Sequence, residues 1–184
     1  MGEIKNSIVL LAVFTVLLGL VYPLVIMGIS QLAFPDQANG NLIKVNGTVV
    51  GSTLIGQEFT SPQYFHGRPS AIDYNSSSSS GSNLGPTNQK LIDNVNQNLE
   101  NIRTENSLNP NDIIPADLVE TSASGLEGYI YVDSAMIQVH RIASARNISE
   151  SKVIKIIEDN KEIPLGTGNP IINVLKLNIA LDKL

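Results

Sequence analysis

The chain has 184 residues, no cysteine and a formal net charge of −5 at pH 7. The lack of cysteine excludes disulfide frameworks, zinc–thiolate sites and thiol nucleophiles. The acidic balance argues against nucleic acid as a partner, because nucleic-acid binding needs a basic surface.

The first predicted element is a membrane-spanning helix. Residues 8–29 form a continuous apolar run without a charged side chain. At 1.5 Å per residue a helix of this length spans roughly 33 Å, about the hydrocarbon thickness of a bilayer. A cleaved signal peptide is the alternative, but its apolar region is usually about 7–15 residues long and ends in an A-x-A-like site, which 27–31 match poorly. A lipoprotein anchor is excluded because there is no cysteine. We therefore predict a retained transmembrane helix over residues 8–30.

The charges that flank this run predict its orientation. Lys5 and the α-amine precede it, with Glu3 opposing them, whereas the first basic residue after it is Lys44. The positive-inside bias then places a short N-terminus, residues 1–7, in the cytoplasm. Residues 31–184 are expected to form one soluble, extracytoplasmic domain at the cell membrane. They are numerous enough for a single domain with a proper core.

A β-hairpin is predicted after the helix. Two β-prone runs, 42–45 and 48–50, flank Asn46 and Gly47. Asn-Gly favours a type I′ turn, which needs positive φ at both central residues. The second strand is expected to continue through 52–56.

A long loop is predicted over residues 60–88, which are rich in proline, glycine and serine. Loops of this length are usually functional or disordered. Aromatic side chains in and beside it favour a loop that is attached to the core. They are Phe59, Tyr64, Phe65 and Tyr74.

A helix is predicted next. Thr87 or Asn88 can cap it, and its apolar residues recur at the spacing of one helical face. These residues are Leu91, Val95, Leu99 and Ile102. An Asn-Pro-Asn sequence at 109–111 ends it, and 115–119 predict a short extended or 3₁₀ segment.

Another helix is predicted from Asp133 or Ser134, either of which can cap it, to about Arg146. Its inward-facing residues are expected to be Met136, Val139, Ile142 and Ala143.

Two more helices are predicted toward the C-terminus. Ser149 can cap a helix over 150–159, with apolar Val153, Ile154, Ile156 and Ile157. Asn169 followed by proline predicts an N-cap and a helix over 171–181. The alternation at 174–177 also fits a strand.

Helices outweigh strands, and a hairpin comes early. The sequence therefore predicts an α+β fold: a single N-terminal transmembrane helix followed by one mixed α/β extracytoplasmic domain with an early β-hairpin and several helices.

The search for catalytic groups finds little. No glycine precedes Lys-Ser or Lys-Thr as in a P-loop, and His66 and His140 have no partner at metal-ligand spacing. We predict no catalytic residue and no metal site. Ser149 and Lys152 match the Ser-x-x-Lys pattern of acylating enzymes, but helix capping explains Ser149 more simply.

Carboxylates are concentrated between residues 93 and 133, where Arg103 is the only base. Such a stretch is either a solvated acidic surface or a field that raises the local cation concentration near a membrane pore. Its carboxylates are Asp93, Glu100, Glu105, Asp112, Asp117, Glu120, Glu127 and Asp133.

The apolar run itself contains small and polar residues at the spacing of one helical face. Such residues let membrane helices approach each other closely, so this face predicts docking against another membrane protein. They are Ala12, Thr15, Gly19 and Tyr22.

A series of sequence blocks, in order, resembles the C subunit of the Kdp-type potassium-transporting P-type ATPases, the KdpC family. The similarity covers nearly the whole chain, including the single N-terminal span. The blocks are 51–59, 62–71, 74–75, 80–88, 115–119, 121–126, 138–141, 145–146 and 173–178.

The resemblance implies an accessory, non-catalytic subunit of a high-affinity, ATP-driven potassium import complex. Its partners would be a channel-like potassium-binding subunit, an ATP-hydrolysing P-type subunit and a small membrane peptide. The family is described as a catalytic chaperone that raises the ATP affinity of the hydrolysing subunit. This implies nucleotide contacts by Ser122, Ser124, Gly125 and Gln138.

The predicted orientation conflicts with a direct contact to cytoplasmic ATP, so we favour a structural role. In that role the chain assembles and stabilises the pump, docking on the potassium-binding subunit through the loops at 52–88. A membrane-anchored Ser/Lys hydrolase and an acidic cation-gathering domain at the pore mouth are the alternatives. The docking residues expected in the loops are Gln57, Phe59, Tyr64, Phe65, Arg68, Ser82 and Asn83.

Overall fold

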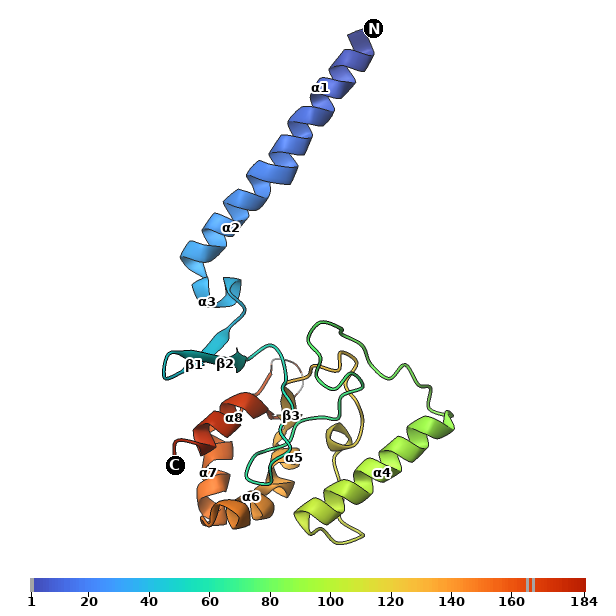
Figure 1. Ribbon diagram of the computed structural model, residues 1–184, viewed down its shortest axis with the longest axis vertical. Coiled ribbons are helices and arrows are strands. Elements are labelled where there is room, and N and C mark those ends of the chain that lie inside the picture. The colour runs from blue at the N-terminus through green and yellow to red at the C-terminus, as the bar shows by residue number, and fades with distance from the viewer. Residues whose placement is uncertain (1, 165, 167) are drawn as a thin grey trace. The chain divides into compact units, whose positions relative to one another are not determined.

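The computed structural model describes residues 2–164, 166 and 168–184. The chain divides into two compact units, Met1–Val50 and Gly51–Leu184. Figure 1 shows the elements of both.

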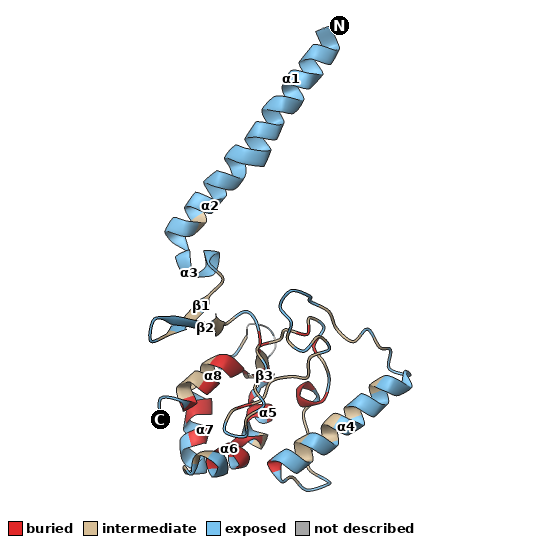
Figure 2. Cartoon of the chain, viewed as in Figure 1, coloured by how far each residue is buried: buried red, intermediate tan, exposed pale blue. Residues whose placement is uncertain are grey.

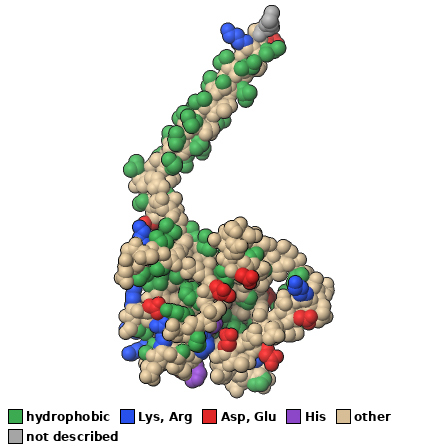
Figure 3. Space-filling model, viewed as in Figure 1, with side chains coloured by type: hydrophobic (Ala, Val, Ile, Leu, Met, Phe, Trp, Pro, Cys, Tyr) green, Lys and Arg blue, Asp and Glu red, His purple; other side chains and the backbone are tan. Residues whose placement is uncertain are grey.

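The first unit begins with one continuous helix, Gly2–Ala33, made of α1 (Gly2–Val16), a π-helical turn (Leu17–Val21) and α2 (Tyr22–Ala33). None of its described residues is buried, and hydrophobic side chains cover it along its length (Figures 2 and 3). It is long and apolar enough to cross a membrane. The helix begins and ends beyond the predicted span of 8–30.

The π-helical turn has a local cause in Pro23. Proline has no N–H to donate, and its ring crowds the carbonyl four residues earlier, so a regular α-helical ladder cannot continue through it. The N–H of Tyr22 instead donates to the carbonyl of Leu17, five residues back. The turn is thereby widened by one residue.

The hairpin prediction is confirmed. After α3 (Pro35–Ala38), strands β1 (Leu42–Val45) and β2 (Thr48–Ser52) pair in a two-stranded sheet. Asn46 and Gly47 between them have φ of 51° and 81°, as a type I′ turn requires. The expected extension through 52–56 is limited to an isolated bridge between Ser52 and Ile55.

The second unit is built around a strand pair that the sequence did not predict. Strands β3 (Tyr129–Tyr131) and β4 (Ile171–Asn173) pair antiparallel, with Ile130 opposite Ile172. Both isoleucines are buried at the centre of the core. The helices packed around them are α5 (Val132–Ile137), α6 (Val139–Arg146), α7 (Glu150–Asn160) and α8 (Val174–Leu181).

The predicted C-terminal helix over 171–181 is wrong at its start. Residues Ile171–Asn173 are a strand, and Asn173 rather than Asn169 is the N-cap, its side chain accepting from the N–H of Lys176 at 3.1 Å. The core helix α8 follows from Val174, which removes the strand alternative for 174–177.

The helix predicted from 133 or 134 to 146 is divided in two. It begins at Val132, and Gln138 separates α5 from α6, its N–H donating three residues back to Ala135. Val139, Ile142 and Ala143 face the core as expected, but Met136 is 38% exposed. The three-residue hydrogen bond tightens the chain at Gln138, so one α-helical face does not continue unchanged across it.

Helix α4 (Gln89–Asn106) matches its prediction, and the Asn88 side chain caps it by accepting from the N–H of Lys90 at 2.9 Å. Its apolar stripe, however, is only partly buried; Asn106 is the one buried residue of the helix (Figure 2). The predicted 3₁₀ segment is present at Ala116–Leu118, and α7 follows Ser149 as expected.

Candidate functional site

Two buried amide side chains hold the backbone of the long loop. Gln138 accepts from the N–H of His66 (2.8 Å) and donates to its carbonyl (3.1 Å). Asn178, on α8, accepts from the N–H of Phe65 (2.8 Å) and donates to its carbonyl (3.0 Å). Each amide pairs with both polar groups of one residue, as a neighbouring strand would. The loop is thereby fixed against the core at two successive residues.

Arg141 of α6 ties this loop to α4. Its Nη1 donates to the carbonyls of Pro62 (2.6 Å) and Tyr64 (3.0 Å), and its Nε donates to Asn106 Oδ1 at 3.0 Å. Its Nη2 donates to Gln138 Oε1 at 2.8 Å. Burial lowers the pKa of this guanidinium from its ordinary value. One side chain thus joins the loop, α4 and the break between α5 and α6.

Arg146 makes a second connection nearer the surface. It donates to the carbonyls of Gln63 (2.7 Å) and Leu181 (3.0 Å) and to Asp182 Oδ1 (2.8 Å). Its guanidinium lies 5.0 Å from the centre of the Tyr64 ring, and the Tyr64 hydroxyl donates to Asp182 Oδ2 at 3.0 Å. That hydrogen bond to Asp182 raises the pKa of Tyr64.

A tight turn at 122–125 holds the serine-rich part of the loop. Ser122 Oγ accepts from the N–H of Gly125 at 2.9 Å, and Ser124 Oγ accepts from the N–H of Leu126 at 3.1 Å. The carbonyl of Ser124 accepts from the N–H of Ser80 at 3.0 Å. The Ser70 hydroxyl donates to the carbonyl of Gly125 at 2.7 Å. The turn therefore fastens two points of the 70–80 segment.

Gly125 is expected to be irreplaceable in this turn. Its φ is +69°, and a Cβ there would lie 2.6 Å from Ile72 Cγ1 and 2.8 Å from the carbonyl oxygen of Ser80. We expect Gly125→Ala to lower the free energy of unfolding by about 1–3 kcal/mol. Urea unfolding of the full chain in mild detergent measures it. Gly85→Ala is the matched control, because nothing lies within 4 Å of a Cβ at Gly85. Equal effects of the two substitutions would contradict the prediction.

The residues predicted to contact nucleotide all hold the protein's own loop. Gln138 is 0% exposed, and its oxygen accepts two hydrogen bonds while its nitrogen donates two, the second of them to the carbonyl of Ser134. An amide has no further strong hydrogen bonds to offer. Ser122, Ser124 and Gly125 form the tight turn. A nucleotide contact by these four residues stays a prediction, and by Gln138 it would require rearrangement.

The helix residues predicted to dock do not all share one face. Ala12 and Thr15, three positions apart in the regular helix α1, do so. The π-helical turn adds one residue to the hydrogen-bonded ring and rotates the side chains beyond it by roughly 100° relative to a regular helix. Tyr22 is therefore turned away from the predicted face. Gly19 lies within the wide turn, with nothing within 4 Å of a Cβ.

Among the loop residues predicted to dock, Phe65 is a core residue. It is 0% exposed, so its side chain offers no surface to a partner. Phe59 and Tyr64 are half-buried, with ring centres 5.7 Å apart. Arg68 donates to the carbonyls of Glu120 and Thr121 at 3.3 and 3.4 Å. Gln57 and Ser82 are also half-buried, and Asn83 is exposed.

The acidic stretch at 93–133 does not form one solvated field. Asp117 is buried, accepting from the Ser134 hydroxyl (2.5 Å) and the N–H of Tyr131 (2.8 Å), and so fixes the start of α5. Glu105 lies 3.5 Å from His66 Nδ1. Burial lowers the pKa of His66, which favours the neutral ring. The described residues contain no group of three or more His, Cys, Asp or Glu side chains placed to hold a metal ion.

The Ser149–Lys152 pattern gains no support as a catalytic pair. The Ser149 hydroxyl lies 3.0 Å from that of Ser151, and both Ser149 and Lys152 are exposed. Ser149 is the N-cap residue of α7, with its carbonyl accepting from the N–H of Lys152 at 3.0 Å. The geometry is that of a helix start.

Comparison with known proteins gives a consistent result over the whole chain. Residues 4–183 match the family model described as KdpC, the K+-transporting ATPase c chain. The chain is 45% identical over 196 residues to a potassium-transporting ATPase KdpC subunit of Rhodopseudomonas palustris strain BisB18, covering 98% of this chain and 97% of that protein.

Two further relatives are also potassium-transporting ATPase KdpC subunits. The KdpC subunit of Mycobacterium tuberculosis strain H37Rv is 48% identical over 186 residues, covering 99% and 98% of the two chains. That of Caulobacter vibrioides strain NA1000 is 48% identical over 187 residues, covering 99% of this chain and 93% of that protein. The match to the family model and these near-full-length identities show that the chain belongs to the KdpC family, the accessory c chains of potassium-transporting ATPase complexes.

Proposed function

We propose that this chain is a non-catalytic assembly subunit of a potassium-importing ATPase. The helix Gly2–Ala33 spans the membrane with its N-terminus in the cytoplasm, and the unit Gly51–Leu184 lies outside. The loops at 52–88 dock on the potassium-binding subunit. The ATP-hydrolysing subunit and the small membrane peptide complete the set of partners.

One observation is the main support for this role. The polar residues in the blocks shared with the family hold the chain's own loop in one shape: Gln138, Arg141 and Asn178 contact its backbone. A loop fixed at many points exposes a preorganised surface, which lowers the entropy cost of binding a partner. This is what an assembly subunit requires.

An effect on ATP affinity is then indirect. A domain outside the membrane cannot reach cytoplasmic nucleotide, so it acts by favouring one conformation of its partners. The chaperone role implied by the family and the structural role are compatible in this form.

Orientation can be tested with single cysteines, because the chain has none of its own. A membrane-impermeant maleimide applied to intact cells should label a Ser78→Cys variant, in the exposed serine run. An Asn6→Cys variant should react only after the cells are permeabilised. The reverse pattern would contradict the proposed topology.

The assembly role is tested by omitting the chain. We expect complexes purified without it to lose subunits and to lose ATP-driven potassium uptake in vesicles. Intact assembly with full uptake in its absence would overturn the proposal. Restoring uptake by adding the full chain is the control for damage during purification.

A further inference from the structure

A groove runs along α4. Two cavities, of about 390 and 300 Å³, adjoin each other and share Pro69, Ser70 and Asn98 in their linings. Helix α4 forms one wall, and loop residues between 58 and 84 together with residues 118–121 form the rest of the lining. The lining extends from Lys90 near the start of the helix to Glu105 at its end, roughly 22 Å of helix at 1.5 Å per residue.

The apolar stripe of α4 faces this groove and is incompletely covered. Leu91, Val95 and Ile102 line it and remain half-buried. Inward-facing residues of the core helices, such as Ile142 and Ile157, are fully buried. An amphipathic helix gains its stability by burying such a stripe. The described residues of this chain therefore leave room along α4 for another apolar group.

Helix α4 is nevertheless held in place. Its last residue, Asn106, accepts from Arg141 at 3.0 Å, and in its middle Asn98 donates to the carbonyl of Val119 at 2.9 Å. The groove is therefore a formed feature with fixed walls, open along its length.

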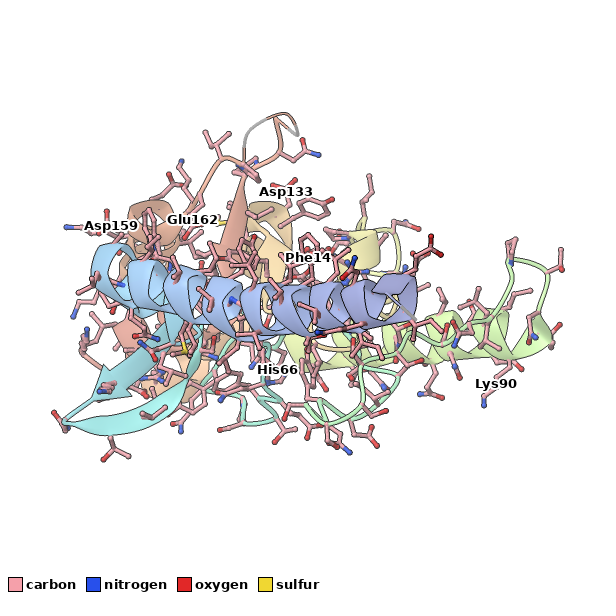
Figure 4. All side chains as sticks on the ribbon, turned by 90° about the horizontal axis from the view of Figure 1, so that it is seen from above. Phe14, His66, Lys90, Asp133, Asp159 and Glu162 are labelled. Carbon is pink, nitrogen blue, oxygen red and sulfur yellow. The ribbon has the colours of Figure 1, made fainter. Side chains whose placement is uncertain are left out.

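The two ends of the groove differ in charge. Near the end of α4 it is lined by three carboxylates, Glu58, Asp73 and Glu105, against one guanidinium, Arg68. At the other end Lys90 and Glu120 both line the groove, so their charges balance. Figure 4 shows Lys90 at the far end of α4 from His66, which lines the acidic part. An occupant that suits both ends is basic at one end only.

We propose that this groove binds an extended segment of another subunit of the ATPase complex, with a lysine or arginine seated among Glu58, Asp73 and Glu105. This inference rests on the proposed assembly role and names one docking site within it. At about 3.3 Å per residue, the groove length accommodates six or seven extended residues. Apolar side chains of the segment pack on the stripe of α4, and the amides of Asn94 and Asn98 hydrogen-bond its backbone. The carboxylates disfavour a phosphate or an anionic lipid headgroup in the same place.

Photo-crosslinking in the purified full complex tests this. A photo-reactive residue is placed at Asn94, which lines the groove, or at Asn96, which is also exposed on α4 but does not line it. We expect position 94 to crosslink to one non-helical segment of another subunit with a Lys or Arg within about seven residues, and position 96 not to. A crosslink to a second copy of this chain, to lipid, or to a segment without a basic residue would overturn the proposal.

Charge reversal tests the acidic end. Glu105→Lys should lower the crosslink yield from position 94 about three- to tenfold, because attraction becomes repulsion. Glu100→Lys is the matched control on the same helix, since Glu100 is exposed and does not line the groove. Equal effects of the two substitutions would overturn the proposal.

A third probe at Thr15 separates the groove inference from docking by the apolar helix. If Thr15 crosslinks to a partner and Asn94 does not, the groove inference is wrong and docking by the helix stands. If neither position crosslinks in an assembled complex, both docking sites are wrong, whereas the assembly role is overturned only by intact assembly and full uptake without the chain.

Discussion

Replacing Arg141 with alanine is expected to lower the free energy of unfolding by about 3–5 kcal/mol. The guanidinium satisfies four acceptors: the carbonyls of Pro62 and Tyr64 and the side-chain oxygens of Asn106 and Gln138. Alanine leaves these acceptors without their donor in a largely buried place. Urea unfolding of the full chain in mild detergent, followed by far-ultraviolet circular dichroism, measures the loss.

Two variants sharpen this first prediction. Arg141→Lys keeps the charge but cannot donate along the four directions of the guanidinium. We therefore expect this variant to keep only part of the stability that Arg141→Ala loses. Lys155→Ala removes an exposed basic residue from α7 and should change stability by less than about 0.5 kcal/mol. A loss below about 1 kcal/mol for Arg141→Ala would show that water or the loop replaces its hydrogen bonds.

Replacing Phe65 with alanine is expected to cost about 3–5 kcal/mol and to release the long loop. Phe65 is 0% exposed and belongs to the same core cluster as the residues of α5–α8, although it comes from a loop. Its loss leaves a cavity and removes the apolar anchor of the segment. The same unfolding experiment measures stability, and limited proteolysis between residues 60 and 88 should become faster.

Ile113→Ala is the control for this second prediction, because Ile113 is 90% exposed and its truncation should change stability by less than about 0.5 kcal/mol. Phe65 and Arg141 hold the same segment. The double variant should therefore lose less free energy of unfolding than the two single variants, Phe65→Ala and Arg141→Ala, lose together. Unchanged proteolysis of the loop in Phe65→Ala would contradict the anchoring role.

Elements with local causes could be predicted from the sequence. The Asn46-Gly47 turn, the Asn88 cap and the apolar helix each depend on residues within a few positions of one another. The β3–β4 pair could not be predicted in this way, because each strand has three residues and the partners are separated by some 40 positions. The strand at Ile171–Asn173 was consequently read as part of a helix.

The candidate site was predicted less well, for a related reason. The sequence places Phe65 in a loop and Gln138 in a predicted helix, but it does not show which way their side chains face. Phe65 was expected both to attach the loop to the core and to dock on a partner, and its burial agrees only with the first. Gln138, expected in contact with nucleotide, is also buried. Arg141 and Asn178 were not singled out as site residues, although a signal existed for Asn178. Asn178 is a polar residue within the apolar face of a helix, which indicates a buried hydrogen bond. Arg141 has no such signal, because at about 100° per residue it lies roughly opposite Val139 on its helix.

The pairing of Phe65 and His66 with Asn178 and Gln138 also affects how the loop can change over evolutionary time. The backbone path at these two residues is set by the amides of Gln138, between α5 and α6, and Asn178, on α8, and not by the exposed side chains of the loop. The exposed side chain of Gln63 is therefore free to vary without altering the path of the chain at this point. Mutations there can retune recognition of a diverging partner while the scaffold stays constant.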